Sequence, residues 1–296
     1  MSITTADIKW LHVESSTRCN AWCPACPRNQ NGKDLNPLLT ELDLSTNRYR
    51  ETLDSLPTLE GIQFCGNYGD PVIAQNFMEL IKASVGKTKK IQIHTNGSLR
   101  NTSWWKTLAT ALAKFESHDV WFGIDGVAGT HEIYRQGTSF EKIINNAKAF
   151  IDNGGIATWQ FIPFKHNEAE IKKCIKLSQE LGFKKFKIVK SFRKNKTVAR
   201  HWRTGKEFLL EPADIYKNKW EILEKNQVLE KDCMHLSQPG IYLSANGNLS
   251  PCCYLSDELA ESSSTALLSK HNIKVMIKQN PLSTCLRNCG SSKPTC

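Results

Sequence analysis

The sequence has no long hydrophobic run. No stretch approaches the ~18 consecutive apolar residues that a membrane-spanning helix needs. The N-terminal sequence, MSITTADIKWLHVES, also lacks the charged-then-apolar pattern of a secretory signal. We therefore expect a cytoplasmic protein without a membrane partner.

Cysteine is too sparse for a disulfide scaffold. The chain has 11 cysteines among 296 residues, far below the ~8–10% of small disulfide-rich proteins. Thiols stay reduced in the cytoplasm, so cysteines that cluster in the sequence are expected to bind metal ions or iron–sulfur clusters. Hydrophobic residues make up 40% of the chain, which excludes an intrinsically disordered protein.

Acidic residues are outnumbered, with 29 Asp and Glu against 39 Lys and Arg, and the net charge is +10. Much of the excess falls in residues 190–206, which hold seven Lys or Arg and no acid. We interpret this stretch as a solvated linker or surface. The alternative is a binding surface for an acidic leader peptide, a phosphorylated small molecule or a nucleic acid.

The order of strand-like and helical patterns predicts the fold class. From Trp10 to Ser191, short β-type runs alternate with amphipathic helical segments, which is typical of βαβ units. The expected strands are Leu11–Ser15, Gly61–Cys65, Ile91–Thr95, Val120–Ile124, Thr158–Pro163 and Phe186–Val189. We therefore expect an α/β protein with a partial (β/α)6 TIM-like barrel over residues 8–190, short of the full eight repeats.

The remainder of the chain is expected to form two smaller parts. Residues 191–231 are interpreted as a basic linker followed by a helix at Pro212–Lys231, and residues 232–296 as a small C-terminal domain. A β-hairpin is expected in that domain, with strands at Ile241–Ser244 and Leu249–Tyr254 joined by an Asn-Gly turn.

Three cysteines lie close together directly after the first expected strand. Cys19, Cys23 and Cys26 have the spacing C-x3-C-x2-C. Three thiolates on one short loop can bind three irons of a [4Fe–4S] cluster and leave the fourth iron open to an exogenous ligand. The alternative is a zinc site, since Cys-x2-Cys pairs also bind zinc.

This loop resembles the defining motif of the radical S-adenosylmethionine (SAM) superfamily. In that superfamily the motif follows the first strand of a partial barrel, which corresponds to residues 10–190 of this chain. The resemblance implies that the open iron binds SAM. It also implies that an electron from a donor such as a flavodoxin or ferredoxin cleaves SAM to a 5′-deoxyadenosyl radical, which abstracts a hydrogen atom from the substrate.

Two further segments resemble SAM-binding elements of the same superfamily. Residues 66–71 (GNYGDP) are similar to its Gly-Gly-Glu-Pro segment, which implies that Gly69 and Asp70 belong to the site for the SAM amino group. Residues 95–97 (TNG) are similar to a Thr-Asn-Gly turn that is common in the same subgroup.

The sites for the SAM carboxylate and adenine are implied in the same way. The segment Gly-Ile-Asp-Gly that begins at Gly123, followed by Arg135, is similar to a Ser-x-Asp-Gly and Arg element that holds the carboxylate. Gly123 stands where that element has its serine. Ala25 stands where the superfamily has an aromatic residue, so the adenine is expected to pack on Trp22 or on the end of the fifth strand near Ile162.

A second group of cysteines lies in the last quarter of the chain. Cys233, followed by Gly247 and Cys252, is similar to the C-x9–15-G-x4-C pattern of SPASM and twitch auxiliary-cluster domains. The resemblance implies one auxiliary [4Fe–4S] cluster, and hence two clusters in all, with the ligands Cys233, Cys252, Cys285 and Cys289. Cys296 is the alternative to one of the last two, and Cys253 is expected on the opposite face of a strand from Cys252. The alternative for the whole group is a structural zinc site.

These features predict a radical SAM oxidoreductase that modifies a peptide or a small metabolite, which would be acidic if the basic stretch binds it. The alternatives are a nucleotide- or RNA-modifying member of the superfamily and a non-catalytic zinc-binding nucleic-acid module. The sequence does not identify the catalytic acid or base. Side chains near the motifs are His94, His131, Tyr134, His235 and Tyr254. Cys65 and Cys174 are interpreted as core thiols.

Overall fold

Strands and helices alternate along the chain. The computed structural model describes residues 5–30, 32, 34–189, 197–215 and 240–255. The strands of the central sheet are β1 (Trp10–Val13), β4 (Gly61–Phe64), β5 (Lys90–Thr95), β6 (Ser117–Gly123), β7 (Ala157–Phe161), β8 (Lys185–Ile188), β11 (Gly240–Leu243) and β12 (Leu249–Ser250). The helices are α1 (Thr46–Asp54), α2 (Phe77–Ser84), α3 (Thr102–Leu112), α4 (His131–Tyr134), α5 (Phe140–Ile151) and α6 (Ile171–Glu180).

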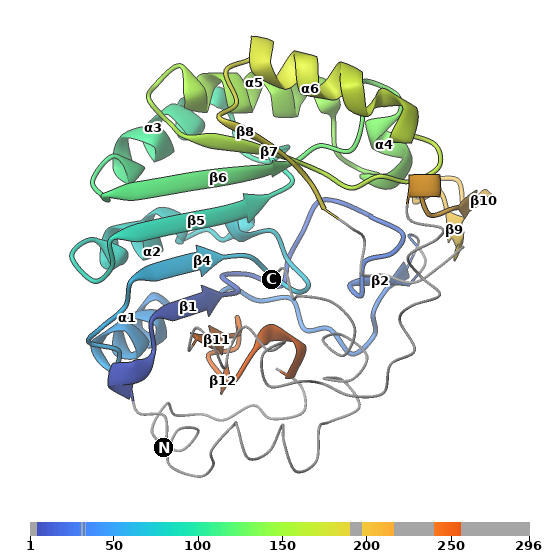
Figure 1. Ribbon diagram of the computed structural model, residues 1–296. Coiled ribbons are helices and arrows are strands. Elements are labelled where there is room, and N and C mark those ends of the chain that lie inside the picture. Colours follow the sequence, from blue (N-terminus) through green and yellow to red (C-terminus); the bar gives the residue numbers. More distant parts are fainter. Residues whose placement is uncertain (1–4, 31, 33, 190–196, 216–239, 256–296) are drawn as a thin grey trace.

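The eight strands of the central sheet have the order β12-β11-β1-β4-β5-β6-β7-β8. Neighbouring strands are parallel except for the antiparallel pair β11 and β12. All six predicted strands are present as β1 and β4 to β8, with small shifts at their ends. The fold class is therefore the predicted one, α/β with a partial TIM-like barrel, and the parallel strands end at one edge of the sheet (Figure 1).

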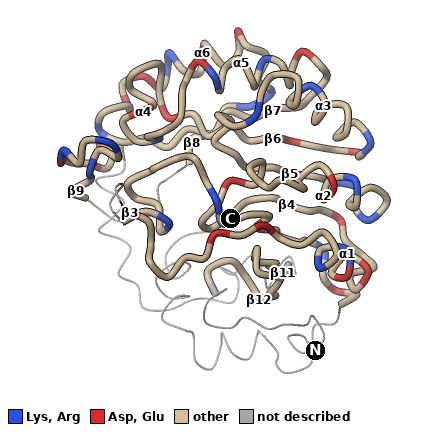
Figure 2. Tube along the Cα trace, turned by 180° about the vertical axis from the view of Figure 1, so that it is seen from behind, with Lys and Arg blue, Asp and Glu red and all other residues tan. Residues whose placement is uncertain are grey.

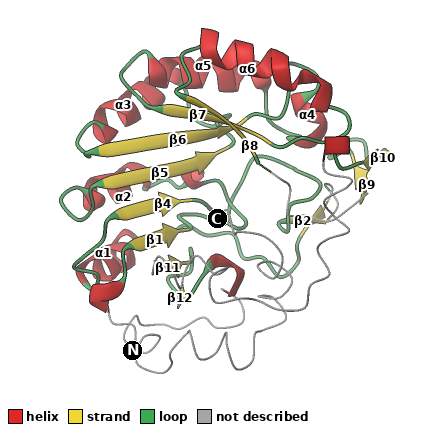
Figure 3. Ribbon diagram, viewed as in Figure 1, coloured by secondary structure: helices red, strands yellow, loops and turns green. Residues whose placement is uncertain are grey.

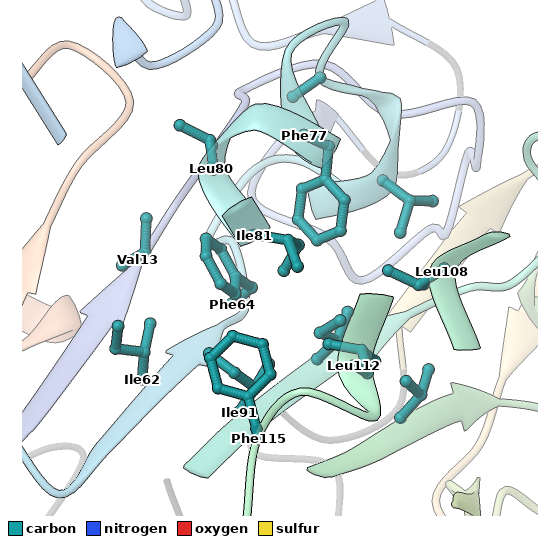
Figure 4. Packing of buried hydrophobic residues seen from close by; sticks show 14 of the residues in the cluster. Val13, Ile62, Phe64, Phe77, Leu80, Ile81, Ile91, Leu108, Leu112 and Phe115 are labelled. Carbon is teal, nitrogen blue, oxygen red and sulfur yellow. The ribbon is translucent and has the colours of Figure 1, made fainter. Parts of the chain in front are cut away.

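The helices lie on the outer side of the curved sheet (Figure 3). Every second residue of each strand points toward them, because side chains alternate between the two faces of a strand. Figure 4 shows Ile62 and Phe64 of β4 packed with Phe77, Leu80 and Ile81 of α2. Each of these side chains is fully buried, and burial of one such side chain contributes about 1.5–3 kcal/mol. This layer holds the sheet in its curved shape.

The opposite, inner face of the sheet is much more polar. His12, Gln63, His94, Trp121 and Gln160 alternate with the core residues of β1, β4, β5, β6 and β7, and each is partly exposed. The sheet therefore presents hydrogen-bonding side chains to the space that it partly encloses.

The C-terminal hairpin is present and lies in the central sheet. β11 is parallel to β1, and Gly247 in the hairpin turn has a φ of +87°, a left-handed conformation that favours glycine. Strand β12 is shorter than predicted, because Pro251 has no N–H group to continue the ladder, and residues 253–255 form a 3₁₀ turn. The expectation that Cys252 and Cys253 point to opposite faces of a strand is therefore wrong, since neither residue is in a strand.

Several smaller elements were not predicted. They include the helices α1 and α4 and two antiparallel pairs, β2 (Asn29–Gln30) with β3 (Asp34–Leu35) and β9 (Thr197–Arg200) with β10 (Glu207–Leu210). In α1 the only buried apolar side chains are Tyr49 and Leu53, too few for a clear helical pattern. Strand β9 lies within the basic stretch of residues 190–206, and β10 directly follows that stretch.

The predicted domain boundaries near residues 190 and 231 stay predictions, because they fall within or beside segments outside the described residues. The same holds for most of the helix expected at Pro212–Lys231. Within the described ranges, every helix is too short or too polar to cross a lipid bilayer.

Candidate active site

The three cysteines of the first group share one loop between β1 and β2. The N–H of Cys26 donates to the carbonyl of Cys23 at 3.0 Å, and the N–H of Ala21 donates to Sγ of Cys19 at 3.4 Å. All three cysteines belong to a small apolar cluster with Tyr134, separate from the main core. The structure therefore brings the three thiols together at the edge where the parallel strands end.

The surroundings of Cys19 disfavour a thiolate in the absence of a cation. Burial raises the pKa of Cys19, and negative charge on Asp70 and Cys23 raises it further. The guanidinium of Arg135 is close enough to Cys23 for the two charges to interact. A thiolate at Cys19 therefore needs a further positive group beside it, which a metal centre provides.

The loop after β4 is joined to the end of β5 by Asp70 and lies close to the segment before the first cysteine at Gly69. The Asp70 carboxylate accepts hydrogen bonds from the N–H of Asn96 at 2.6 Å and the hydroxyl of Thr95 at 2.9 Å. A Cβ at Gly69 would lie 1.8 Å from the carbonyl oxygen of Ser16, so no other residue fits there without movement of the backbone. Burial raises the pKa of Asp70, whereas these donors oppose that change. The side chain of Asp70 thus joins two loops of the site.

The Thr-Asn-Gly turn after β5 contacts the first cysteine. Nδ2 of Asn96 lies 3.6 Å from Sγ of Cys19 and donates to Oδ1 of Asn20 at 2.9 Å. Asn20 donates in turn to the hydroxyl of Ser98 at 2.7 Å. An N–H group beside a ligand sulfur orients the ligand and tunes the metal centre that it binds.

Arg135 is fixed by a buried ion pair at the end of β6. Its Nε donates to Oδ2 of Asp125 at 2.6 Å, and Oδ1 of Asp125 accepts the N–H of Ile162 at 2.6 Å. Burial alone would lower the pKa of Arg135, but the negative charges of Asp125 and Cys23 raise it above the usual value. The guanidinium is therefore charged.

Gly123 makes room for this guanidinium. A Cβ at position 123 would lie 2.7 Å from one terminal nitrogen of Arg135. The missing side chain lets Arg135 lie directly against the end of β6. Among the described residues, the one hydrogen-bond acceptor of Arg135 is Asp125, which engages Nε. The two terminal nitrogens are thus in a position to donate to a carboxylate.

The residues expected near the adenine lie at the border of the thiol cluster. Ala25 and Ile162 both pack against it and are partly exposed. The indole ring of Trp22 is stacked on that of Trp202, with ring centroids 6.0 Å apart and an interplanar angle of 17°. One face of Trp22 is therefore already covered, and both Trp22 and Ile162 stay predictions for the adenine contact.

The described part of the basic stretch packs onto the cysteine loop. Ala199 and Leu210 of the β9–β10 hairpin are buried in the same apolar cluster as the thiols. The N–H of Trp202 donates to Oε1 of Gln136 at 2.7 Å, and Nε2 of Gln136 donates to the carbonyl of Arg200 at 3.2 Å. Lys and Arg of this hairpin lie on its surface near β9 (Figure 2). The interpretation of residues 190–206 as a solvated surface thus fits the charged side chains of this hairpin. It does not fit Ala199, which is buried.

Glu14 is a residue of the site that the sequence analysis missed. It lies one position beyond β1, is 2% exposed, and accepts hydrogen bonds from the N–H of Tyr68 at 2.7 Å and the hydroxyl of Tyr242 at 2.8 Å. Burial raises the pKa of Glu14, and its hydrogen-bond donors oppose that change. An acidic residue inside the first expected strand, Leu11–Ser15, was the available signal.

Two of the acid and base candidates have structural roles. Nδ1 of His131 accepts the N–H of Asp125 at 3.0 Å, and its Nε2 lies 3.0 Å from the hydroxyl oxygen of Thr138. The ring of Tyr134 packs on that of Phe164, with centroids 4.4 Å apart. Both side chains are buried.

His94 is on the inner face of the sheet. Its ring is stacked on that of Trp121, with centroids 4.6 Å apart, and Nε2 lies 3.3 Å from Nε2 of Gln63. Burial and the neighbouring His12 lower the pKa of His94 to about 3, so the ring is neutral near pH 7. It is suited to hydrogen bonding rather than to general acid catalysis. Tyr254 lies in the 3₁₀ turn after β12, and His235 lies outside the described residues.

Of the predicted auxiliary ligands, the described residues include Cys252, which is partly exposed just after β12. The other three, and the alternative Cys296, lie outside the described residues. The auxiliary site therefore stays a prediction. Cys174 is fully buried on α6, as expected of a core thiol, whereas Cys65 lies on the inner side and is partly exposed.

The first cysteine loop fits an iron–sulfur cluster by its donor set. Each cysteine of a [4Fe–4S] cluster binds a different iron, so its ligands need not converge on one point. In the part of the chain that the structure describes, no three Cys, His, Asp or Glu side chains converge on a position for a single metal ion. Three thiols on one loop, with an amide donor at Cys19 and a cation near Cys23, are consistent with a cluster.

Comparison with known proteins locates this fold among solved structures. No family model and no curated protein sequence matches the chain. SuiB from Streptococcus suis bound to S-adenosylmethionine is similar with a TM-score of 0.58 and 14% identity, over 95% of this chain and 68% of SuiB. SuiB bound to precursor peptide SuiA gives a TM-score of 0.57 and 15% identity, over 93% of this chain and 66% of SuiB.

A second protein has a similar fold over most of its length. The structure of anSMEcpe with bound AdoMet and Cp18Cys peptide is similar with a TM-score of 0.59 and 16% identity, over 95% of this chain and 88% of anSMEcpe. SuiB and anSMEcpe are radical SAM enzymes. The chain therefore has the fold of radical SAM enzymes.

Proposed function

We propose that this chain is a radical SAM oxidoreductase that modifies a peptide. The observation that carries the proposal is the meeting of four elements at one edge of the sheet, the edge where sites of barrel enzymes lie. The cysteine loop follows β1, Asp70 follows β4, Asn96 follows β5 and Arg135 follows β6, and each contacts or electrostatically interacts with another member of this group. The sequence motifs predicted each element separately.

Each element has a role in the proposal. A [4Fe–4S] cluster would be held by Cys19, Cys23 and Cys26. The backbone carbonyls of residues 66–70 would bind the amino group of SAM, and Arg135 would bind its carboxylate. Ala25 and Ile162 would border the adenine. When bound, the cluster and SAM supply a 5′-deoxyadenosyl radical that abstracts a hydrogen atom from the substrate.

The residues of this chain would orient SAM and place groups of complementary charge beside its carboxylate and amino groups. Asp125 holds Arg135 charged and against Gly123, so that the terminal nitrogens of Arg135 can donate to the carboxylate. Gly69 and Asp70 fix the loop that carries the carbonyl acceptors. The buried aromatic side chains around the loop limit the access of water.

A second [4Fe–4S] cluster is part of the proposal and is supported by the cysteine pattern of the C-terminal region. Its ligands would be Cys233, Cys252, Cys285 and Cys289. Electrons released on oxidation of the substrate would pass to that cluster, and a flavodoxin or ferredoxin would reduce the SAM-binding one.

A peptide is the substrate class best supported, with a small metabolite as the alternative. SuiB and anSMEcpe, which share the fold, were solved with the peptides SuiA and Cp18Cys. RNA modification rested on the basic stretch. In its described part, Trp202 packs on the cysteine loop and Arg200 is paired with Glu207, which leaves fewer cations for a phosphate backbone.

The first experiment is an anaerobic preparation of the full chain. We expect brown protein with about eight irons and eight sulfides per chain, and release of 5′-deoxyadenosine from SAM on reduction with dithionite. The variant C23A should lose that release and about half the iron, whereas the matched variant C174A, which removes a buried core thiol, should keep both. Colourless protein with stoichiometric zinc would support the non-catalytic module instead.

The same preparation tests the auxiliary cluster. The variant C252A should keep about four irons and still release 5′-deoxyadenosine at saturating SAM. Full iron content in C252A would rule out Cys252 as a ligand.

A further inference from the structure

We propose that the hairpin β11–β12 is part of the SAM site and that Tyr242 is a positioning residue for SAM. Tyr242 would act through Glu14 on the loop of residues 66–70. This inference rests on the proposed function and deepens it, because that function assigns the C-terminal region to an auxiliary cluster alone.

The first contact is a carboxylate shared by two distant segments. The hydroxyl of Tyr242 donates to Oε2 of Glu14 at 2.8 Å. The other oxygen, Oε1, accepts the N–H of Tyr68 at 2.7 Å and that of Gly69 at 3.4 Å. Glu14 therefore connects β11 directly to the backbone of the loop.

The second contact reaches the same loop from the far end of the hairpin. Nδ2 of Asn67 donates to the carbonyl oxygen of Cys253 at 2.7 Å. The loop is thus attached to the residues before β12 through Glu14 and to the residues after β12 through Asn67. The second attachment is one residue from Cys252, the predicted auxiliary ligand.

Glu14 sets the direction of the loop carbonyls. A trans peptide group is planar, and its C=O points opposite to its N–H. Because the N–H groups of residues 68 and 69 point at Glu14, the carbonyls of residues 67 and 68 point away from it. These carbonyls belong to the set that the proposed function assigns to the ammonium group of SAM, so an error in their direction weakens SAM binding.

Tyr242 is itself held rigidly. It is 0% exposed, pairs with His12 in the parallel register of β11 and β1, and meets the His12 ring edge-on with centroids 4.9 Å apart. Nε2 of His12 lies 2.5 Å from the carbonyl oxygen of Cys65, which precedes the loop. Because Glu14 is also buried, water has little access to replace a lost tyrosine hydroxyl.

The test compares two variants that each remove one buried tyrosine hydroxyl. Y242F removes the bond to Glu14, and the control Y49F removes a bond to Ser84 of 2.6 Å between α1 and α2, far from the loop. Both are prepared anaerobically as the full chain with its iron restored. The measurements are the Kd of SAM by equilibrium dialysis, the rate of 5′-deoxyadenosine release with dithionite, and the iron content.

Y242F should raise the Kd of SAM about tenfold, a change of ~1.4 kcal/mol, with the release rate at saturating SAM within about twofold of the wild type. Y49F should leave the Kd unchanged. An unchanged Kd in Y242F, or an equal rise in both variants, would overturn the inference. Iron-loaded wild-type protein that binds no SAM would instead refute the proposed function.

A second variant covers the case in which Y242F does not fold. N67A removes the contact with Cys253 and keeps the Tyr242–Glu14 pair. It should also raise the Kd of SAM while the rate at saturating SAM is kept. A Kd equal to that of the wild type would contradict the inference.

Discussion

The carboxylate of Asp125 and the guanidinium of Arg135 form an ion pair in which the acid is completely buried and the base is 16% exposed. The second oxygen of Asp125 accepts a backbone N–H at the end of β7, so the acid has no face toward solvent. The guanidinium of Arg135 is therefore the member of the pair that is accessible to a ligand. This asymmetry suits a site for a carboxylate ligand.

The variant D125N should destabilise the protein, because it leaves the charge of Arg135 partly buried and unpaired. We expect a loss of about 3 kcal/mol, the usual cost of removing one partner of a buried pair, and a thermal midpoint lower by ~5 °C or more. Thermal unfolding of the full chain measures it. The control D54N removes an acid that is 67% exposed and paired with Lys87, and it should cost less than ~0.5 kcal/mol. Equal midpoints for both variants would contradict the prediction.

Gly69 and Gly154 are glycines for two different physical reasons, a lack of space for a side chain and a left-handed backbone conformation. A Cβ at Gly69 would meet the carbonyl oxygen of Ser16 at 1.8 Å, whereas Gly154 has a φ of +87° and nothing within 4 Å of its Cβ position. G154A should cost about 1–2 kcal/mol of unfolding free energy, the cost of left-handed backbone for alanine. G69A should cost more and also lower the iron content, because the loop must move away from the cysteines. Thermal unfolding and iron analysis of both variants test this, and an unchanged iron content in G69A would argue against it.

The sheet and the cysteine loop were predictable because their signals are local. In β5 the order Ile91, Gln92, Ile93, His94 alternates between core and inner face, and the thiols lie within eight residues of one another. The contact between Tyr242 and Glu14 joins residues 228 positions apart. It depends on the pairing of β11 with β1, for which the sequence carries no local signal.

The role of Gly123 was also beyond the sequence. The sequence shows only that Gly123 stands where the similar element has a serine, whereas the structure shows Arg135 in the space that a side chain would take. The error over Cys253 had a local cause. Pro251 was expected within a strand, although it lacks the N–H group that a ladder needs.

Trp121 and Trp159 differ in the hydrogen bonding of their indole N–H groups. Nε1 of Trp121 is buried with no hydrogen-bond partner among the described residues, whereas Nε1 of Trp159 donates to the carbonyl of Ile124 at 2.8 Å. W121F removes an unpaired donor, and W159F leaves a buried carbonyl without its partner. W159F should therefore cost ~1–3 kcal/mol more than W121F. Urea unfolding of the two variants measures the difference, and equal losses would contradict it.

His131 should make stability depend on pH. Because Nδ1 accepts the N–H of Asp125, the neutral ring carries its proton on Nε2, which faces the hydroxyl of Thr138. A proton on Nδ1 would point at that N–H group. Burial and then the charge of Arg135 lower the pKa of His131 to about 3, from 6.5 in the unfolded chain.

The sign of the effect follows from proton binding. Below pH 6.5 the unfolded chain takes up a proton that the folded one does not, so stability is full above pH 6.5 and is lost as the pH falls toward 3. Between pH 8 and pH 6 the loss from His131 is about 1 kcal/mol. Thermal midpoints of the wild type and H131Q at these two pH values test it, because other groups titrate alike in both proteins. The wild type should lose more stability than H131Q on acidification, and an equal loss would show that His131 takes up its proton in the folded protein as readily as in the unfolded chain.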